Sequence, residues 1–240
     1  MRALIFDCDG VLVDTERDGH RVAFNRAFAA LDLGVEWDIP LYGELLQVAG
    51  GKERMKHYFD SVGWPAERED KDDLIRDLHR IKTEAFRGMI VLGELNFRPG
   101  VVRLIDEAIA AGVQLAVCST SNERAVHSIV DKLGPARRSR FDLILAGDVV
   151  SRKKPDPEIY LRALEELDVS ATDCFVVEDN RNGLLAAKAA GIRCLITTSS
   201  YSCSEDFREA DLVVDELGDP PSVRVTLEQL EQIRLEGAAG

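Results

Sequence analysis

The sequence predicts an α/β fold built on a parallel sheet. Short apolar runs recur along the chain, and stretches with helical spacing lie between most of them. This alternation is typical of parallel sheets that helices cover on both faces. Such strands are buried on both sides, which explains why the runs are continuously apolar. The runs lie at residues 3–6, 113–118, 143–146, 174–177, 194–197 and 212–214.

The first strand is followed by a long segment, about residues 15–95, that has no good strand signal. It contains several amphipathic patterns instead, including one at 22–31 and one at 74–89. We therefore predict an inserted helical domain over residues 15–96. The core domain is expected to combine residues 1–14 with 97–240, and its first helix, beginning near Val101, is expected to end at Gly112.

Composition excludes several classes of protein. The chain has 240 residues, of which 45% are apolar and 30% charged, as in an ordinary globular protein. Its formal net charge of −13 disfavours nucleic acids and anionic membranes as partners. No run approaches the roughly 18 apolar residues of a membrane span. The five cysteines form no metal-binding or redox pattern, so we expect reduced thiols in the cytoplasm. We also expect a monomer.

Polar residues follow the predicted strands at their carboxyl ends, where ligands bind in sheets of this kind. Each residue alone is more typical of a helix cap, a turn or a solvent-exposed position than of a binding site. Together they place carboxylates, hydroxyls and an ammonium at one edge of the sheet. They are Asp7, Asp9, Ser119, Thr120, Ser121, Asn122, Lys154, Glu178 and Asp179.

The acids in this group predict a metal site. Asp7, Asp9 and Asp179 come from two strand ends, and such a cluster needs a compensating cation. Carboxylate oxygens without histidine or cysteine nearby favour Mg²⁺, which also bridges to substrate phosphates. Lys154 and the Ser119 hydroxyl are expected to balance the charge of a transferring phosphoryl group.

These residues resemble the four motifs of haloacid dehalogenase-like phosphatases. The segment 6–16 is similar to the first motif, Asp-x-Asp-Gly-x-x-x-Asp, and Ser119, Lys154 and the Glu178-Asp179 pair match the other three in order. The resemblance implies a Rossmann-like core with an inserted helical cap of the C1 type.

The resemblance also implies a role for each residue. Asp7 would be the nucleophile, and Asp9 the acid that protonates the leaving oxygen and later activates water. Mg²⁺ would be held by Asp7, the backbone carbonyl of Asp9, Asp179 and Glu178. The transferring phosphoryl group would be held by Ser119, Thr120 and Lys154.

Segments 14–20, 41–46, 50–55, 117–123 and 147–150 resemble the CbbY subgroup, especially its plant-type members. That subgroup removes the 1-phosphate of xylulose-1,5-bisphosphate, an inhibitor of Rubisco, so the chloroplast stroma is a second possible location. Segment 50–55 lacks the first glycine of a Walker phosphate loop, because residue 46 is leucine. The resemblance assigns the distal phosphate and sugar to Gly51, Lys52, Arg54, Ser121, Asn122, Glu16, His20 and Tyr42.

Two alternatives stay open on the residues alone. A phosphosugar mutase of the β-phosphoglucomutase type shares the motifs and the cap, and differs in passing the phosphoryl group to a sugar hydroxyl. A receiver-like phosphoacceptor also uses an aspartate, Mg²⁺ and a lysine, but it has no use for a long helical insert. The sequence therefore favours a Mg²⁺-dependent phosphatase of a small sugar bisphosphate.

Overall fold

The computed structural model describes residues 1–48, 50–65 and 70–236, so parts of both predicted domains (49, 66–69 and 237–240) lie outside the described residues. The chain forms two compact units. The first joins Met1–Asp14 to the residues from Asn96 onward, and the second is Thr15–Leu95. The second unit is thus inserted into a loop of the first.

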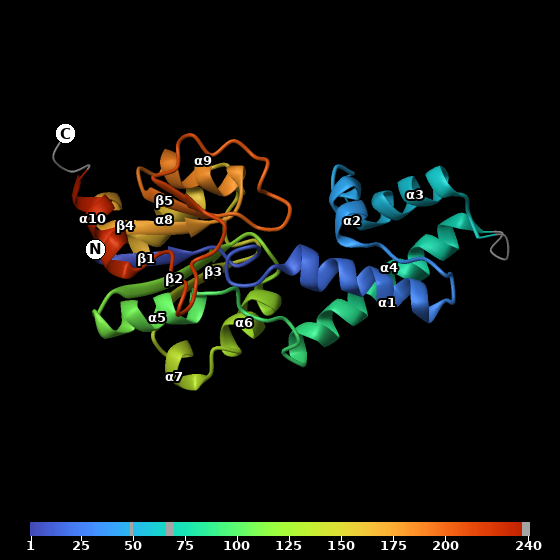
Figure 1. The fold of residues 1–240 in the computed structure, drawn as a ribbon, viewed down its shortest axis with the longest axis horizontal. Coiled ribbons are helices and arrows are strands. Elements are labelled where there is room, and N and C mark those ends of the chain that lie inside the picture. Colours follow the sequence, from blue (N-terminus) through green and yellow to red (C-terminus); the bar gives the residue numbers. More distant parts are fainter. Residues whose placement is uncertain (49, 66–69, 237–240) are drawn as a thin grey trace. The chain divides into compact units, whose positions relative to one another are not determined.

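The first unit is built on a six-stranded sheet in the order β3-β2-β1-β4-β5-β6, with every neighbouring pair parallel (Figure 1). The predicted α/β fold with a parallel sheet is confirmed. Its central strand β1 pairs Ile5 with Ala116 on one side and with Val176 on the other. The strands are β1 (Ala3–Phe6), β2 (Gln114–Ser119), β3 (Phe141–Ala146), β4 (Cys174–Glu178), β5 (Arg193–Thr197) and β6 (Leu212–Val214).

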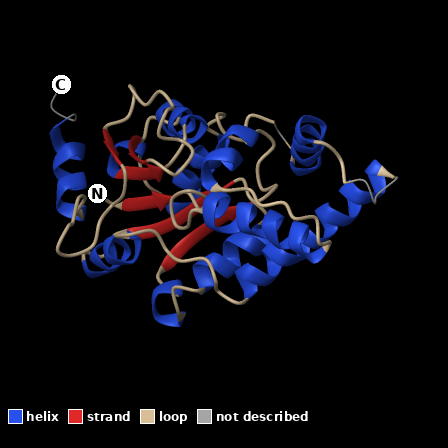
Figure 2. Ribbon diagram, turned by 45° about the vertical axis from the view of Figure 1, so that its right-hand side comes forward, coloured by secondary structure: helices blue, strands red, loops and turns tan. Residues whose placement is uncertain are grey.

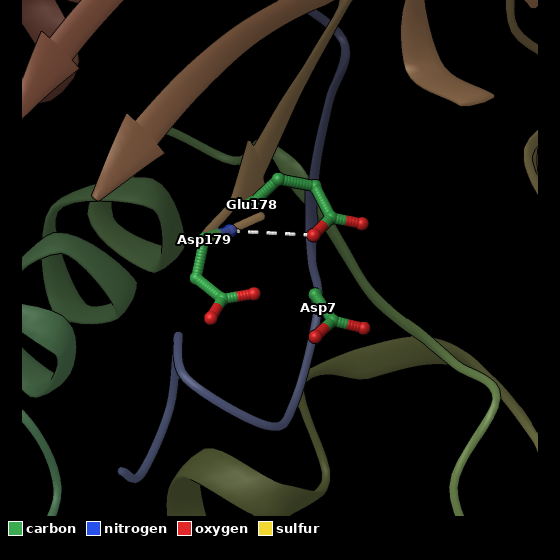
Figure 3. A group of neighbouring side chains, drawn as sticks. All are labelled: Asp7, Glu178 and Asp179. Atoms are coloured by element: carbon green, nitrogen blue, oxygen red, sulfur yellow. Dashed lines mark hydrogen bonds between the residues drawn. The ribbon is translucent and has the colours of Figure 1, made fainter. Parts of the chain in front are cut away.

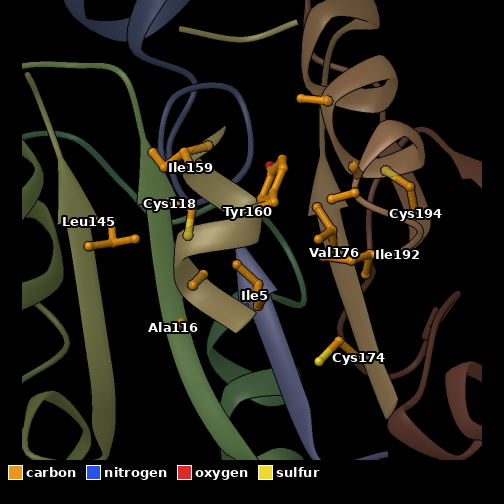
Figure 4. Close-up of a cluster of buried hydrophobic side chains, with 14 of the residues drawn as sticks. Ile5, Ala116, Cys118, Leu145, Ile159, Tyr160, Cys174, Val176, Ile192 and Cys194 are labelled. Carbon is orange, nitrogen blue, oxygen red and sulfur yellow. The ribbon is translucent and has the colours of Figure 1, made fainter. Parts of the chain in front are cut away.

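Helices cover both faces of this sheet (Figure 2). Helices α8 and α9 pack on one face over a core that includes Ile5, Ala116 and Val176 (Figure 4), and α5 and α6 pack on the other. Burial on both faces is the physical reason for the continuously apolar strands. The helices are α5 (Val101–Ala110), α6 (Glu123–Asp131), α7 (Pro135–Arg138), α8 (Glu158–Leu167), η2 (Ala171–Asp173), α9 (Arg181–Ala189) and α10 (Leu227–Glu236).

The second unit is helical in its described residues. A π-helical turn, η1 (Thr15–His20), leads into α1 (Arg21–Ala30), which packs along α4 (Lys71–Val91). Helices α2 (Ile39–Leu45) and α3 (Gly51–Val62) complete the unit. Its core is aromatic, with Phe24, Phe28, Trp37, Tyr42 and Phe59 all buried. No helix within the described part of the chain is long and apolar enough to cross a membrane.

Candidate active site

The strand ends bring the predicted polar residues of the first unit together. Asp7 follows β1 directly, and the register places Phe6 beside Val117 of β2 and Val177 of β4. Asp7 is therefore one residue beyond Phe6, close to the ends of β2 and β4. Both of those strands end in predicted site residues, Ser119 and Glu178. The parallel arrangement, rather than any local sequence contact, creates this cluster.

Three carboxylates converge at this edge. Asp7, Glu178 and Asp179 each offer one oxygen, and the three oxygens lie within 4.8 Å of one another (Figure 3). All three residues are buried, with Glu178 fully removed from solvent. Burial of this much negative charge is costly unless a cation compensates it.

Lys154 supplies one compensating charge. Its Nζ lies 2.7 Å from Asp7 Oδ1, 2.6 Å from Glu178 Oε1 and 2.9 Å from the carbonyl oxygen of Cys118. The lysine side chain is only 7% exposed, so the ion pairs are screened little by water. One ammonium against three carboxylates still leaves an excess of negative charge.

The pKa values of Asp7 and Asp179 are raised, chiefly by burial. Burial, partly opposed by Lys154, raises the pKa of Asp7 well above its usual range. Burial and the neighbouring Glu178 raise the pKa of Asp179 to about 7. Burial alone would lower the pKa of Lys154, but Asp7 and Glu178 raise it instead, so the ammonium stays charged. A bound cation would lower the pKa of both carboxyl groups and favour their ionised form.

Two glycines allow the acids to approach the backbone. A Cβ atom on Gly10 would lie 2.0 Å from Asp179 Oδ2, and Gly10 also has a positive φ of 77°. A Cβ atom on Gly183 in α9 would lie 2.0 Å from the carboxyl carbon of Glu178. Any larger residue at either position would displace a carboxylate, so these glycines shape the site.

Asp9 lies beside the cluster but outside its three converging oxygens. Its Oδ2 accepts a hydrogen bond from the Ser121 hydroxyl. Ser119 is buried at the end of β2, and its Oγ accepts a hydrogen bond of 3.2 Å from the backbone N–H of Ser121. The predicted hydroxyl-bearing loop after β2 is therefore tied to the loop that carries Asp9.

Thr120 and Asn122 line a cavity of about 500 Å³ at the ends of β2 and β3, together with Gly147 and Lys153. The Asn122 side chain also caps α6, because its Oδ1 accepts a hydrogen bond of 3.3 Å from the N–H of Ala125. Asn122 is thus a helix cap that also lines a cavity, and its role in binding the distal phosphate stays a prediction.

In the second unit, three predicted residues form a chain of hydrogen bonds. Tyr42 donates to Glu16 Oε2 at 2.6 Å, and Arg54 Nη1 donates to the Tyr42 hydroxyl at 3.0 Å. Arg54 also donates to the carbonyl oxygen of Leu45 and stacks over the Tyr42 ring at 5.2 Å. Arg54 is buried, so this guanidinium is held in one place.

The other predicted residues of this unit lie nearby in the helices. His20 Nδ1 lies 3.0 Å from Lys82 Nζ, and burial together with Lys82 and Arg54 lowers the pKa of His20 to about 3. Because an ammonium can only donate, Nδ1 of the neutral ring accepts the bond. Gly51 and Lys52 form the first turn of α3, where Lys52 is exposed.

Sequence reasoning missed Lys82 and Tyr160. A lysine on an apolar helix favours extension to solvent, but Lys82 lies over the rings of Phe24 and Phe86, and burial lowers its pKa to about 8. Tyr160 is fully buried in α8 and donates to Glu178 Oε1. The available signal was a tyrosine on the apolar face of a helix, whose hydroxyl needs a partner.

Comparison with known proteins identifies relatives of the whole chain. A family model described as haloacid dehalogenase-like hydrolase matches residues 1–191. The CBBY-like protein of Arabidopsis thaliana is 55% identical over 94% of this chain and 72% of its own length. The similarity therefore extends over both structural units.

Solved structures agree with this relationship. A mutant of CbbY from Rhodobacter sphaeroides, crystallised with xylulose-(1,5)bisphosphate, is 42% identical with a TM-score of 0.69, covering 92% of this chain and 96% of its own. A proposed β-phosphoglucomutase from Thermotoga maritima is 27% identical, also with a TM-score of 0.69, covering 89% of this chain and 94% of its own.

Proposed function

Because the chain belongs to the haloacid dehalogenase-like hydrolases, we propose that it is a Mg²⁺-dependent phosphatase that converts xylulose-1,5-bisphosphate to xylulose 5-phosphate. The observation that carries this proposal is the convergence of Asp7, Glu178 and Asp179, with Lys154 paired to the first two of them. The related CbbY crystallised with xylulose-(1,5)bisphosphate supports the choice of substrate. The enzyme class follows from the family, and the particular bisphosphate is our proposal.

The residues present fit a magnesium ion. The three converging donors are hard carboxylate oxygens, and the charge that Lys154 leaves uncompensated calls for a further cation. We assign the ion to Asp7, Glu178, Asp179 and the backbone carbonyl of Asp9. When bound, Mg²⁺ would neutralise the cluster and polarise a phosphoryl oxygen.

We assign covalent catalysis to Asp7. A carboxylate oxygen of Asp7 attacks phosphorus in line with the leaving oxygen and forms an aspartyl-phosphate. The ammonium of Lys154, held 2.7 Å from Asp7, stabilises negative charge on the transferring oxygens together with Ser119 and Thr120. Water then hydrolyses the acyl phosphate and releases inorganic phosphate.

Asp9 is our proposed acid and base. It would protonate the sugar oxygen as the ester bond breaks and then take a proton from the attacking water. The hydrogen bond from Ser121 holds its carboxyl group in one orientation beside the carboxylate cluster.

We assign recognition of the sugar and its second phosphate to the helical unit as a cap. Arg54 and Lys52 supply positive charge for the distal phosphate, with Gly51 in the same turn and Ser121 and Asn122 from the core. Hydrogen bonding of the sugar falls to Glu16, His20 and Tyr42. The preorganised hydrogen bonds from Tyr42 to Glu16 and from Arg54 to Tyr42 support this assignment, because a fixed polar network loses little freedom on binding.

The test is a panel of phosphate esters assayed for free phosphate. We expect rapid release from xylulose-1,5-bisphosphate and much slower release from ribulose-1,5-bisphosphate and xylulose 5-phosphate, with none from an Asp7→Asn variant. Chelation of Mg²⁺ should abolish the activity. Lack of release from every bisphosphate would overturn the proposal.

A mutase is the second candidate, because the Thermotoga maritima structure is similar over both units. Its signature would be conversion of β-glucose-1-phosphate to glucose 6-phosphate without accumulation of free phosphate. Following both products in one reaction separates the two functions. We propose further that the enzyme acts as a monomer, in the cytoplasm or the chloroplast stroma.

A further inference from the structure

Tyr160 lies next to the Lys154–Glu178 ion pair. It belongs to the first turn of α8, six residues after Lys154, and its side chain is fully buried in the apolar core between α8 and the sheet (Figure 4). Its hydroxyl donates to Glu178 Oε1, and the Lys154 Nζ lies 5.0 Å from the centre of its ring. One side chain therefore contacts both members of the Lys154–Glu178 ion pair.

The carboxylate of Glu178 has few other supports among the described residues. Oε1 receives Lys154 at 2.6 Å and the Tyr160 hydroxyl, whereas Oε2 receives the backbone N–H of Asp179 at 3.3 Å. The absence of a side chain at Gly183 lets the carboxylate lie against the α9 backbone. Without the tyrosine hydroxyl, the position of Oε1 would depend on the flexible side chain of Lys154.

We infer that Tyr160 is a positioning residue, which orients the Glu178 carboxylate so that Oε1 holds Lys154 against Asp7 while Oε2 stays with the carboxylates of the proposed Mg²⁺ site. The inference rests on the proposed function and adds a residue outside the family motifs described above. Groups that orient metal ligands typically contribute 10- to 100-fold to metal affinity. Tyr160 does so from within the core and contacts no substrate.

The variant Tyr160→Phe tests the hydroxyl alone. The phenyl ring keeps the packing of α8 and the cation–π contact with Lys154, so the fold is retained. We expect the Mg²⁺ concentration for half-maximal thermal stabilisation, measured without substrate, to rise about tenfold. The KM for the sugar bisphosphate at saturating Mg²⁺ should stay within about twofold of wild type. Tyr58→Phe, which removes a hydroxyl in α3, is the matched control and should change neither value.

A double-mutant cycle identifies the route of the effect. If Tyr160 acts through Glu178, then Tyr160→Phe should change the Mg²⁺ titration less than about twofold in a Glu178→Gln background. An unchanged titration in the single variant, or an equal loss in both backgrounds, would overturn the inference. If wild type hydrolyses the bisphosphate and binds Mg²⁺, and Tyr160→Phe gives the same values, only this inference fails. Wild type without Mg²⁺ stabilisation would defeat the proposed metal site as well.

Discussion

At the scale of single residues, the main feature of the site is buried negative charge that Lys154 compensates only in part. Three buried carboxylates lie together, one ammonium pairs with two of them, and burial together with the neighbouring acids raises the pKa of Asp7 and of Asp179. A divalent cation is the simplest compensation that this set of oxygens accepts. Asp9, two residues from Asp7, lies outside the three converging oxygens, and proton transfer is the role that we propose for its side chain.

The change Asp9→Asn tests the proposed acid and base. We expect kcat to fall by about 10²- to 10⁴-fold, because the amide cannot exchange a proton with the leaving oxygen or with water. The backbone carbonyl is unchanged, so the Mg²⁺-dependent rise in Tm should persist and serves as the internal control. Steady-state phosphate release measures the loss. Full hydrolysis by this variant would refute the assignment.

At the scale of elements, glycines let helices approach the strand ends. Gly183 lies in α9, where glycine ordinarily costs up to about 1 kcal/mol relative to alanine. Glycine is needed here because the Glu178 carboxylate occupies the space that a Cβ atom would fill. Glycine at this position makes α9 less stable than alanine would, and it leaves room for the Glu178 carboxylate.

The pair Gly183→Ala and Gly88→Ala separates the two effects. Gly88 lies in α4 with nothing within 4 Å of an added Cβ, so alanine there should stabilise the protein by about 0.5–1 kcal/mol. Alanine at Gly183 should destabilise it by about 1–3 kcal/mol and lower activity, because the Glu178 carboxylate must shift. Urea unfolding of both variants measures the contrast. A gain in stability at both positions would contradict the role of Gly183 as a spacer.

At the scale of the whole molecule, the net charge does not describe the charge inside each unit. The chain has a net charge of −13, yet the helical unit encloses Arg54, His20 and Lys82 among its polar contacts. Each cation there makes a further positive charge unfavourable. Burial, reinforced by Lys82 and Arg54, lowers the pKa of His20 to about 3, so the ring stays neutral.

The lowered pKa of His20 makes the stability of the fold depend on pH. Unfolded His20 binds a proton below its ordinary pKa of about 6.5, but the folded ring does not until about pH 3. The contribution of His20 to stability is therefore fully present above about pH 6.5 and is lost as pH falls, by about 2 kcal/mol at pH 5. Because the raised pKa of Asp179 shifts stability in the opposite direction over this range, urea unfolding should show the loss as a difference between wild type and His20→Gln that grows as pH falls. The exposed His57→Gln is the control and should keep the wild-type dependence.

Much of the fold follows from the sequence because its causes are local. Continuous apolar runs separated by helical spacing require a doubly covered parallel sheet, and such a sheet places Asp7, Ser119 and Glu178 at one edge. The helical character of the insert follows from its periodicity for the same reason. Neither conclusion depends on which side chains touch.

Only the tertiary structure decided the contacts within each unit. The bond from Tyr160 to Glu178, the bond from Arg54 to Tyr42 and the enclosure of Lys82 beside His20 join residues that are 12 to 62 positions apart. Spacing along the chain determines which face of an element a residue occupies, but not which distant side chain meets it there. The sequence by itself therefore determined the sheet and the acids at its edge, whereas packing decided how those acids and the cap cations are held.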